Sequence, residues 1–343
     1  MSISISKQER TFELKRFYKR NSTAMIFGAG LMVAIYWAYQ VNDTTTQAVL
    51  ASALRHSTPL ILGALCGLIG ERSGIINIGI EGQMLLAAFT GFLVSSATGS
   101  LGFAISIGIL TGALLGLLLA FMSVTLKVDQ IIGGTVINIL ALGLTGYFYQ
   151  PGLTTLGKLQ PIALGKLAEI PLIGRVFFNN PPITYVTIIL VFVVHYVLFY
   201  TRWGLRTRAV GEHPRAADTV GVNVFITRYV NTTIAGGIGG LAGVFLSLEA
   251  VGSFERAMTN GRGFVALAVM IFGKWTPLGS WGAALLFGFA SAMQTQLQFG
   301  GEVNIPHQFI GMLPYVLTII VLAGFVGRSR PPAAEGIPYE KEG

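Results

Sequence analysis

The sequence predicts an all-α integral membrane protein with about ten transmembrane segments, several of them short or broken. Two observations support this fold class. Of the 343 residues, 52% are hydrophobic and only 11% are charged, whereas soluble domains carry about 25% charged residues. The apolar residues also gather in long runs, and the 44 glycines favour helices that pack closely through small side chains.

The chain is expected to divide into three regions. Residues 1–23 form a basic cytoplasmic segment, residues 24–327 form the transmembrane domain, and residues 328–343 form a polar cytoplasmic tail. The net charge of +8 bears on the orientation of the helices rather than on nucleic acid, because the sequence has no clustered basic face with base-reading residues. The single cysteine, Cys66, lies in an apolar run, where we expect it to pack.

The first elements are a span over about Ala24–Tyr39 and an outside amphipathic segment over Gln47–His56. Two short apolar runs follow, Ser57–Ile69 and Met84–Ser96. Neither run reaches the roughly 20 residues that a helix needs to cross a bilayer. Ser57–Ile69 is therefore short enough to be a half-helix rather than a full span.

The stretch Gly70–Met84 separates these two runs and contains Glu71, Arg72, Asn77 and Glu81. Polar groups at membrane depth are tolerated mainly where they face a bundle interior or a water-filled path. Hydrophobic segments interrupted by glycine are typical of the place where a transporter handles its substrate. The stretch thus favours a transport path or gate, and the alternative is a cytoplasmic turn with solvated charges.

The other predicted segments are Leu101–Leu126, Ile131–Tyr149, Thr184–Tyr200, Tyr229–Leu248, Phe264–Phe272, Leu278–Leu297 and Phe309–Val326. Gly112 and Gly116 have the GxxxG spacing of a close helix contact. A Pro-rich connection covers 150–182, and the longest charged internal loop covers 201–228. Phe264–Phe272 is short enough to be a half-helix.

Basic residues indicate the orientation of these segments. If the N-terminus lies inside, the inside positions include Arg72, Lys127, the 201–228 loop, Lys274 and the tail, and they are richer in Lys and Arg per loop than the outside turns. The positive-inside rule therefore predicts that both termini are cytoplasmic. Gly-interrupted segments near 74–82 and 252–263 hint at a weak internal repeat.

Residues that carry chemistry are sparse. The four histidines are scattered and indicate no metal site. Gly152–Lys158 has the glycine spacing of a P-loop, but Leu159 follows where Ser or Thr is needed to hold Mg²⁺. We therefore expect no ATP hydrolysis by this chain, and the spans contain no nucleophile–base pair that indicates an enzyme. The spans also hold almost no acids, which favours an external energy source over a proton or sodium gradient.

One inside loop is informative. Pro214 suits the first position of a helix, and Arg215–Val220 is predicted to form a short helix that Gly221 ends. A short helix of mixed charge on the cytoplasmic face can dock another protein. From the pattern alone, a plain solvated loop is an equal alternative.

Several motifs resemble one family. They are Glu71–Gly82, Arg208–Gly221, Gly261–Ala268 with Ile271–Trp275, and the tail Arg330–Tyr339. They resemble the permease subunits of bacterial and archaeal ABC importers, a family that includes ribose and branched-chain amino acid permeases. The resemblance is closest to the nucleoside branch, of the basic membrane protein type, and runs from about residue 50 to the C-terminus.

The resemblance implies a type II-like importer permease in the cell membrane of a bacterium or archaeon. It implies a second homologous permease subunit, a cytoplasmic ABC ATPase that binds ATP and Mg, and an extracytoplasmic binding lipoprotein that delivers the substrate. This chain itself would hold no cofactor and no metal. The expected substrate is a nucleoside. The alternatives are a simple sugar such as ribose, branched-chain amino acids, or, in another class, a channel or facilitator that works without ATP.

The resemblance implies the ATPase-coupling residues, whereas the path and gate candidates are chosen for the chemistry of their side chains. The residues expected to couple to the ATPase are Gly211, Glu212, His213, Pro214, Arg215, Ala216, Asp218 and Gly221. The residues expected to line the substrate path are Asn77, Glu81, Thr135, Asn138 and Phe264. An amide can donate and accept hydrogen bonds, which suits a base or sugar, and a phenylalanine can stack on a base. Asn138 can instead bond across helices. Glu71 and Arg72 are an inner gate pair or a surface pair of little energetic weight.

Overall fold

The computed structural model describes residues 33–155, 157–299, 306–312 and 329–341, together with positions 30, 316 and 319. The predicted all-helical architecture is confirmed for these residues. Six of the described helices are long and apolar enough to cross a membrane: Asp43–Glu71, Ile80–Thr98, Leu101–Thr125, Gln130–Phe148, Pro182–Tyr200 and Val224–Val251. The predicted segments 1–23 and Phe309–Val326 lie wholly or largely outside the described residues, and half of Ala24–Tyr39 does. The count of ten therefore stays a prediction.

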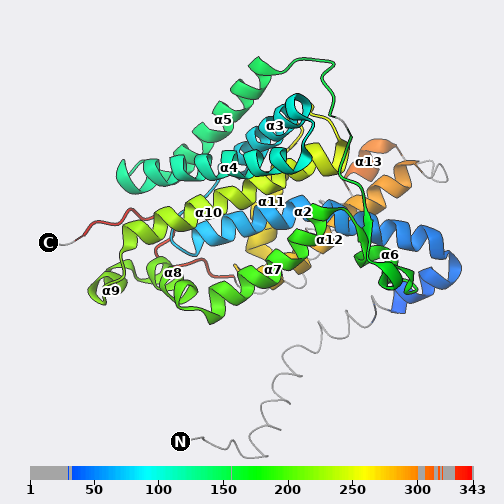
Figure 1. Cartoon of the computed structure of the whole chain (residues 1–343). Helices are drawn as coiled ribbons and strands as arrows, with labels where there is room; N and C mark the ends of the chain where they lie inside the picture. The colour runs from blue at the N-terminus through cyan, green and yellow to red at the C-terminus, as the bar shows by residue number, and fades with distance from the viewer. Residues whose placement is uncertain are drawn as a thin grey trace, which may run out of the picture.

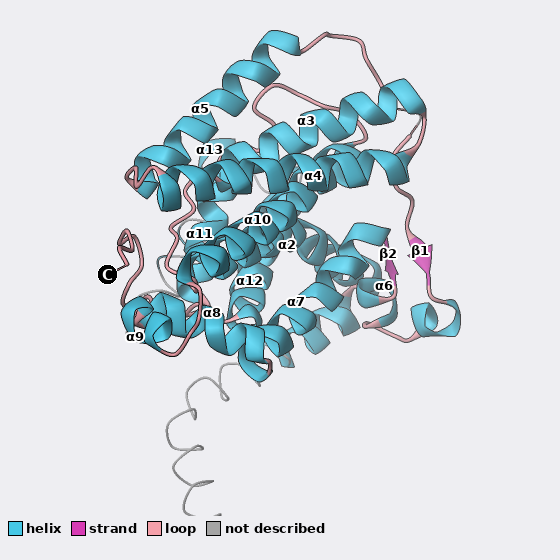
Figure 2. Cartoon of the chain, turned by 60° about the vertical axis from the view of Figure 1, so that its left-hand side comes forward, coloured by secondary structure: helices cyan, strands magenta, loops and turns pink. Residues whose placement is uncertain are grey.

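Two long helices form the middle of the bundle, α2 (Asp43–Glu71) and α10 (Val224–Val244). Above them in Figure 1 lie α3 (Ile80–Thr98), α4 (Leu101–Ala120) and α5 (Gln130–Phe148). Below them lie α7 (Pro182–Tyr200), α8 (Arg202–Glu212) and α12 (Pro277–Phe299). The turned view keeps the same order (Figure 2). Helix α11 (Arg262–Phe272) packs against α2 and α12.

Shorter elements complete the described chain. A π-helical turn, Phe121–Thr125, continues α4, and another, Phe245–Val251, continues α10. The Pro-rich connection contains β1 (Ile162–Ala163), a 3₁₀ turn (Gly165–Glu169), α6 (Gly174–Phe177) and β2 (Asn179–Asn180). The two strands pair antiparallel, with Ile162 opposite Asn180. Helices α9 (Pro214–Thr219) and α13 (His307–Gly311) are short.

Helix α2 corrects the prediction for this region. The predicted outside segment Gln47–His56 and the short run Ser57–Ile69 are parts of one helix of 29 residues. Asn42 caps this helix, because its side chain accepts a hydrogen bond from the N–H of Thr45. Although Pro59 lies inside this helix, the helix runs on from its polar first turns into the apolar run. The helix before the break is therefore long enough to span.

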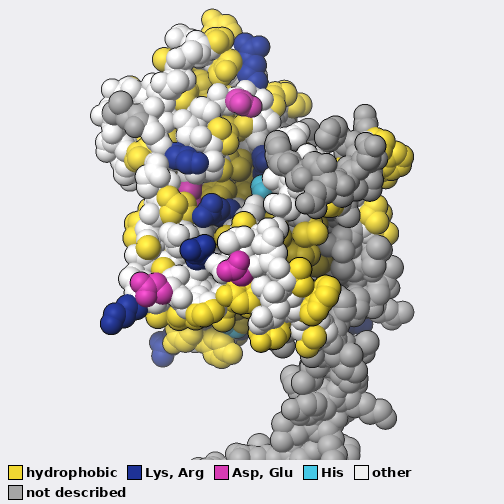
Figure 3. Space-filling view, turned by 90° about the vertical axis from the view of Figure 1, so that its right-hand side faces the viewer, with side chains coloured by type: hydrophobic (Ala, Val, Ile, Leu, Met, Phe, Trp, Pro, Cys, Tyr) yellow, Lys and Arg dark blue, Asp and Glu magenta, His cyan; other side chains and the backbone are white. Residues whose placement is uncertain are grey.

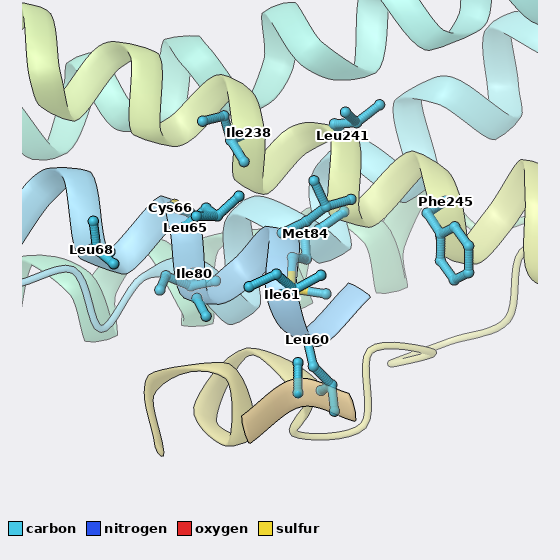
Figure 4. Packing of buried hydrophobic residues seen from close by; sticks show 14 of the residues in the cluster. Leu60, Ile61, Leu65, Cys66, Leu68, Ile80, Met84, Ile238, Leu241 and Phe245 are labelled. Carbon is cyan, nitrogen blue, oxygen red and sulfur yellow. The ribbon is translucent and has the colours of Figure 1, made fainter. Parts of the chain in front are cut away.

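The hydrophobic core lies where α2, α3 and α10 meet (Figure 4). Leu65 and Cys66 from α2 lie beside Met84 from α3, with Ile238 and Leu241 of α10 opposite them. Cys66 is a buried thiol without a disulfide, as its apolar surroundings predicted. These three helices therefore fix where the break between α2 and α3 sits.

Glycine brings α4 and α10 into backbone contact, as the GxxxG spacing predicted. A Cβ atom at Gly112 of α4 would overlap the backbone of Gly236 and Gly240 of α10, and one at Gly116 would overlap Thr232 and Gly236. Such close approach is how membrane helices gain van der Waals contact without a hydrophobic driving force. The glycine-rich face of α10 is therefore a packing face.

Helix α11 is too short to cross a membrane. Its 11 residues rise about 16 Å at 1.5 Å per residue, against a hydrocarbon core of about 30 Å. A tight turn follows it, with Lys274 and Trp275 at φ values of 54° and 51°. The chain then enters α12 at Pro277. The segment Phe264–Phe272 is thus a half-helix that ends inside the bundle.

Candidate functional site

The break between α2 and α3 is a stretch of irregular backbone, residues 72–79. Its first turn folds back on the end of α2, because the N–H groups of Ser73 and Ile75 both donate to the carbonyl of Gly70. Gly74 adopts φ +89°, a backbone conformation that glycine reaches at no steric cost. Irregular backbone at membrane depth needs partners from other elements, and four other parts of the chain supply them.

Helix α5 supplies the first set of partners. The side-chain oxygen of Gln130 accepts from the N–H of Ile76 at 2.6 Å. Asn138 bridges the break and α3: its Oδ1 accepts from the N–H of Gly82 at 2.7 Å, and its Nδ2 donates to the carbonyl of Ile78 at 3.1 Å. Asn138 therefore bonds across elements, the alternative that the sequence had left open beside a place in the path.

Asn77 lies fully buried among α2, α3 and α10. Its Nδ2 donates to Oε1 of Gln83 at 3.1 Å and contacts Sγ of Cys66 at 3.4 Å. The remaining polar atoms of this pair, Oδ1 of Asn77 and Nε2 of Gln83, have no protein partner. Unsatisfied buried polar atoms are costly and mark a functional candidate. Asn77 therefore remains a candidate for the substrate path, and Gln83 becomes a further candidate.

Glu81 joins the two Gly-interrupted segments that the sequence had singled out. Its carboxylate accepts from the N–H of Gly261 at 2.8 Å and from the N–H of Gly263 at 2.6 Å. Both N–H groups belong to the start of α11, where the helix dipole favours a negative charge. Phe264, the next residue, is about half exposed. Glu81 thus ties the start of α3 to the start of the half-helix and brings Phe264 close to the break.

Thr135 stands apart from the other path candidates. Its hydroxyl donates to the carbonyl of Ile131, one turn back on α5, and the residue is exposed. The structure therefore gathers Asn77, Glu81, Asn138 and Phe264 around the break, through contacts that link each to α3 or to the start of α11. Thr135 makes its hydrogen bond within its own helix.

The hydrogen bonds of Glu71 and Arg72 both go to Trp275, in the turn between α11 and α12. The indole N–H of Trp275 donates to Oε2 of Glu71, which is buried, and two nitrogens of Arg72 donate to the Trp275 carbonyl at 3.0 and 2.7 Å. The Arg72 guanidinium also lies 5.7 Å from the ring centre of Phe199, at the end of α7. The two residues thus fasten the break to α11 and α7, and burial of Glu71 excludes a plain surface pair.

Arg228 is a residue whose role the sequence did not indicate. It was counted in the charged 201–228 loop, yet it lies on the first turns of α10 and is 1% exposed. Its guanidinium donates to the carbonyl of Ser73 at 3.2 Å and to that of Ile337 at 3.0 Å. The signal was its spacing: Arg228, Thr232 and Ala235 recur on one helical face, which is the buried face of α10.

Glu249 is another buried carboxylate that sequence reasoning missed. It lies in the π-helical end of α10 and accepts from the N–H of Ile183 at 2.7 Å and from both the N–H and the hydroxyl of Thr184. It therefore caps α7 in the manner in which Glu81 caps α11. Glu81 and Glu249 thus both hold helix N-termini.

The predicted short helix in the inside loop is confirmed. Helix α9 begins at Pro214 and ends at Thr219, with Gly221 at φ +84° after it. The residues predicted to couple to an ATPase are mostly exposed: Glu212, His213, Arg215, Ala216 and Gly221. Gly211 is buried against the carbonyl of Arg72, where a Cβ atom would overlap it. The end of α8, which leads directly into α9 and which we call the base of α9, therefore touches the break.

Segments predicted to lie inside gather at one end of the bundle, which we call the α9 end. Lys127, after α4, forms a salt bridge with Glu340 of the tail. Arg228 binds Ile337 of the tail, and Arg72 binds the turn that holds Lys274 and Trp275. In Figure 1 this end lies on the left, where α8, α9 and the C-terminus meet.

The opposite end carries charged side chains of both signs scattered among hydrophobic ones (Figure 3). A cavity of about 430 Å³ lies there between the start of α2 and the Pro-rich connection, lined among others by Asp43, Glu169 and Arg175. Within the described residues, no group of three His, Cys, Asp or Glu side chains is placed to hold a metal ion.

The fold and the break define a class: a multi-pass membrane protein with a half-helix and an irregular crossing point at its centre. The comparisons with known proteins identify the family. Residues 49–322 match the family described as the branched-chain amino acid transport system / permease component, and the chain belongs to this family. It is thus a transporter permease subunit and not an enzyme.

Individual relatives cover nearly the whole chain. It is 40% identical over 310 residues to the nucleoside ABC transporter permease protein NupC of Lactococcus lactis subsp. cremoris, covering 87% of this chain and 98% of that protein. It is 40% identical over 314 residues to the guanosine ABC transporter permease protein NupQ of Bacillus subtilis, covering 85% and 96%. It is also 35% identical over 303 residues to TsgC13 of Haloferax volcanii, a permease assigned provisionally to glucose, covering 82% and 92%. No solved structure matches the chain significantly.

Proposed function

We propose that this chain is a permease subunit of an ATP-driven importer of nucleosides. The observation that carries the proposal is the 40% identity to two permeases named for nucleosides and for guanosine, over 96–98% of their length. The buried amides near the break fit this substrate class, because an amide can both donate to and accept from a base edge or a sugar hydroxyl.

The importer would contain a second permease subunit. Bacillus subtilis supplies support, since a second guanosine permease protein of that organism, NupP, is 26% identical to this chain, beside the 40% of NupQ. A cytoplasmic ATPase would bind ATP and Mg and supply the energy, and an extracytoplasmic lipoprotein would deliver the nucleoside to the end opposite α9. The α9 end and both termini would then be cytoplasmic, in the membrane of a bacterial or archaeal cell.

The mechanism would be alternating access. Closure of the ATPase pair would push on α9. Residues Gly211 to Gly221, which include α9, would form the coupling surface. Gly211 lies against the carbonyl of Arg72, which places the end of α8 in contact with the break. Movement of α9 would therefore be passed to the break. Glu71, Arg72 and Trp275 would act as the inner gate. Asn77, Glu81 and Asn138, with Phe264 and Thr135, would border the path.

Uptake in cells tests the proposal. Cells carrying the complete set of importer genes take up radiolabelled guanosine, and unlabelled adenosine, guanosine and ribose compete in turn. We expect nucleosides to compete and ribose to have no effect, and a Walker A lysine substitution in the ATPase subunit to abolish uptake. Competition by ribose alone would mean that the substrate is ribose and that the importer mechanism still holds. Uptake without a working ATPase would favour a facilitator.

A sugar is the second candidate substrate, because the relative from Haloferax volcanii is assigned to glucose at 35% identity. Glucose is therefore added to the competition series. Competition by glucose at the concentrations at which guanosine competes would favour the sugar.

A further inference from the structure

The C-terminal tail crosses the α9 end through a turn at residues 333–336 and forms hydrogen bonds with two elements that the mechanism connects. The N–H of Ala334 donates to the carbonyl of Gly211, at the end of α8, at 2.9 Å. Two residues later, the N–H of Gly336 donates to the carbonyl of Gly74, in the break, at 3.2 Å. The tail thus bridges the base of α9 and the break through its own backbone.

Side chains fasten the tail on both sides of this bridge. The Arg228 guanidinium donates to the carbonyls of Ser73 and Ile337, so one buried cation holds the break and the tail together. Tyr339 is buried against Val210, Ala217 and Val224, which come from α8, α9 and α10. Residues 334–339 therefore contact α8, α9, α10 and the break.

The contact between tail and break uses backbone conformations that favour glycine. Gly336 adopts φ +75°, and a Cβ atom there would lie 2.9 Å from the side chain of Ile76. At Gly74, a Cβ atom would lie 2.8 Å from the Arg228 guanidinium and 3.0 Å from the Ala334 carbonyl. Two glycines with positive φ thus face each other where tail and break meet, and the contact depends on both of them.

We propose that residues 332–340 form a strap that makes α9 and the break between α2 and α3 move as one unit, so that movement of the ATPase reaches the gate. This strap proposal rests on the proposed function, because it assigns α9 to the ATPase. It gives the tail a mechanical role in coupling, rather than a role as an extra docking surface for the ATPase.

The first test uses the complete importer with a permease that ends after Arg330. Three quantities are measured: co-purification of the ATPase subunit with the permease, ATP hydrolysis with and without loaded binding protein, and guanosine uptake. We expect the ATPase to co-purify and basal hydrolysis to continue. Uptake and the stimulation of hydrolysis by binding protein should each fall by at least about tenfold, within the range of measured coupling between sites.

A matched pair of point variants guards against a truncated chain that fails to fold. Gly336→Val puts a branched side chain at a positive φ against Ile76 and should uncouple as the truncation does. Ile337→Ser changes the next side chain, which is 56% exposed and lines a cavity of about 580 Å³ between α9 and the tail. Because the strap uses only the backbone carbonyl of Ile337, this variant should keep at least about half of the uptake, as most exposed substitutions do.

Each outcome separates the possibilities. Normal uptake by Gly336→Val, present at wild-type levels in the membrane, overturns the strap proposal. So does loss of ATPase co-purification in Gly336→Val or in Ile337→Ser, because the tail would then act as a docking surface. If the intact chain itself shows no ATP-dependent uptake, the proposed function fails, and that result is visible before any variant is compared.

Discussion

Glu81 accepts a hydrogen bond from the backbone N–H of Gly263 at 2.6 Å, across 182 residues of sequence. The same carboxylate accepts from Gly261. A half-helix that begins inside the bundle has N–H groups in its first turn without intrahelical partners, and this carboxylate satisfies two of them. One side chain therefore holds the position of α11 relative to α3, next to the residues proposed to border the path.

Replacing Glu81 should lower stability. Glu81→Gln keeps the shape but weakens the interaction with the α11 N-terminus, which should cost about 1–2 kcal/mol. Thermal unfolding of the purified permease in detergent measures this. If Glu81 also touches the nucleoside, the ratio of guanosine to adenosine uptake shifts as well. A shift in that ratio with unchanged unfolding would contradict the capping role.

Asn138 and Thr135, one turn apart on α5, form a matched pair. Asn138→Ala removes both bridges to the break and should cost about 1–2 kcal/mol, toward the upper part of the range for polar contacts between membrane helices. Thr135→Val removes only a bond within α5 and should change stability by less than about 0.5 kcal/mol. The comparison is again of unfolding temperature, at equal expression. Equal losses in the two variants would mean that the bridge has little weight.

Adjacent glycines of α10 should respond in opposite ways to alanine. At Gly236 a Cβ atom would overlap the carbonyl of Gly112, while at Gly237 its nearest neighbours lie at ordinary contact distances of 3.6 and 3.7 Å. Gly236→Ala should therefore destabilise the protein by about 1–3 kcal/mol through overpacking. Gly237→Ala should be neutral or slightly stabilising, because alanine suits a helix better than glycine. The yield and the unfolding temperature of the two variants test this prediction. If Gly236→Ala leaves both unchanged, the close contact of α4 and α10 is contradicted.

Docking of the tail should depend on pH through Glu335. Burial raises the pKa of this carboxyl, which faces Glu71. A raised pKa means that the docked tail holds the proton more tightly than an undocked tail, whose pKa is about 4.3. Docking is therefore strongest in acid and weakens as the pH rises through the raised pKa.

Cleavage by chymotrypsin after the buried Tyr339 can report this undocking. We expect the cleavage rate, divided by that of an unfolded peptide with the same sequence, to increase with pH. In Glu335→Gln the neutral amide should remove most of that increase. Parallel pH profiles for the two proteins would assign the dependence to another group.

The salt bridge between Lys127 and Glu340 provides a contrast to Glu335, since it lowers rather than raises the pKa of a carboxyl in the tail. The Lys127 ammonium binds Glu340 and holds the pKa of that carboxyl below its usual range. Both side chains are largely exposed, and exposed pairs contribute little to stability. We therefore expect Lys127→Ala to leave chymotryptic cleavage and uptake nearly unchanged, and a large effect on either would give this pair a role that its exposure does not indicate.

Much of the site could be located from the sequence, because polar residues inside apolar runs are conspicuous. Glu71, Asn77 and Glu81 stood out for this reason, and Pro214 with Gly221 marked the bounds of α9. The extent of α2 was misjudged, since its polar first turns resemble a separate segment and Pro59, which lies inside the helix, does not end it. Arg228 was counted among the solvated charges of the 201–228 loop. The sequence does not show which backbone carbonyls will surround a cation near the end of a helix.

By itself the sequence determined the membrane class, the long apolar helices, the GxxxG contact of α4 and the short helix at α9. These follow from composition and spacing, which act locally along the chain. Only the tertiary structure decided the partners: Glu81 with α11, Asn138 with the break, Trp275 with Glu71 and Arg72, and the tail with Gly74 and Gly211. The partners in these contacts are far apart in the sequence. The separation is 56 residues between Asn138 and Gly82, and 204 residues between Glu71 and Trp275. Such pairings depend on how whole helices pack, which local patterns do not encode.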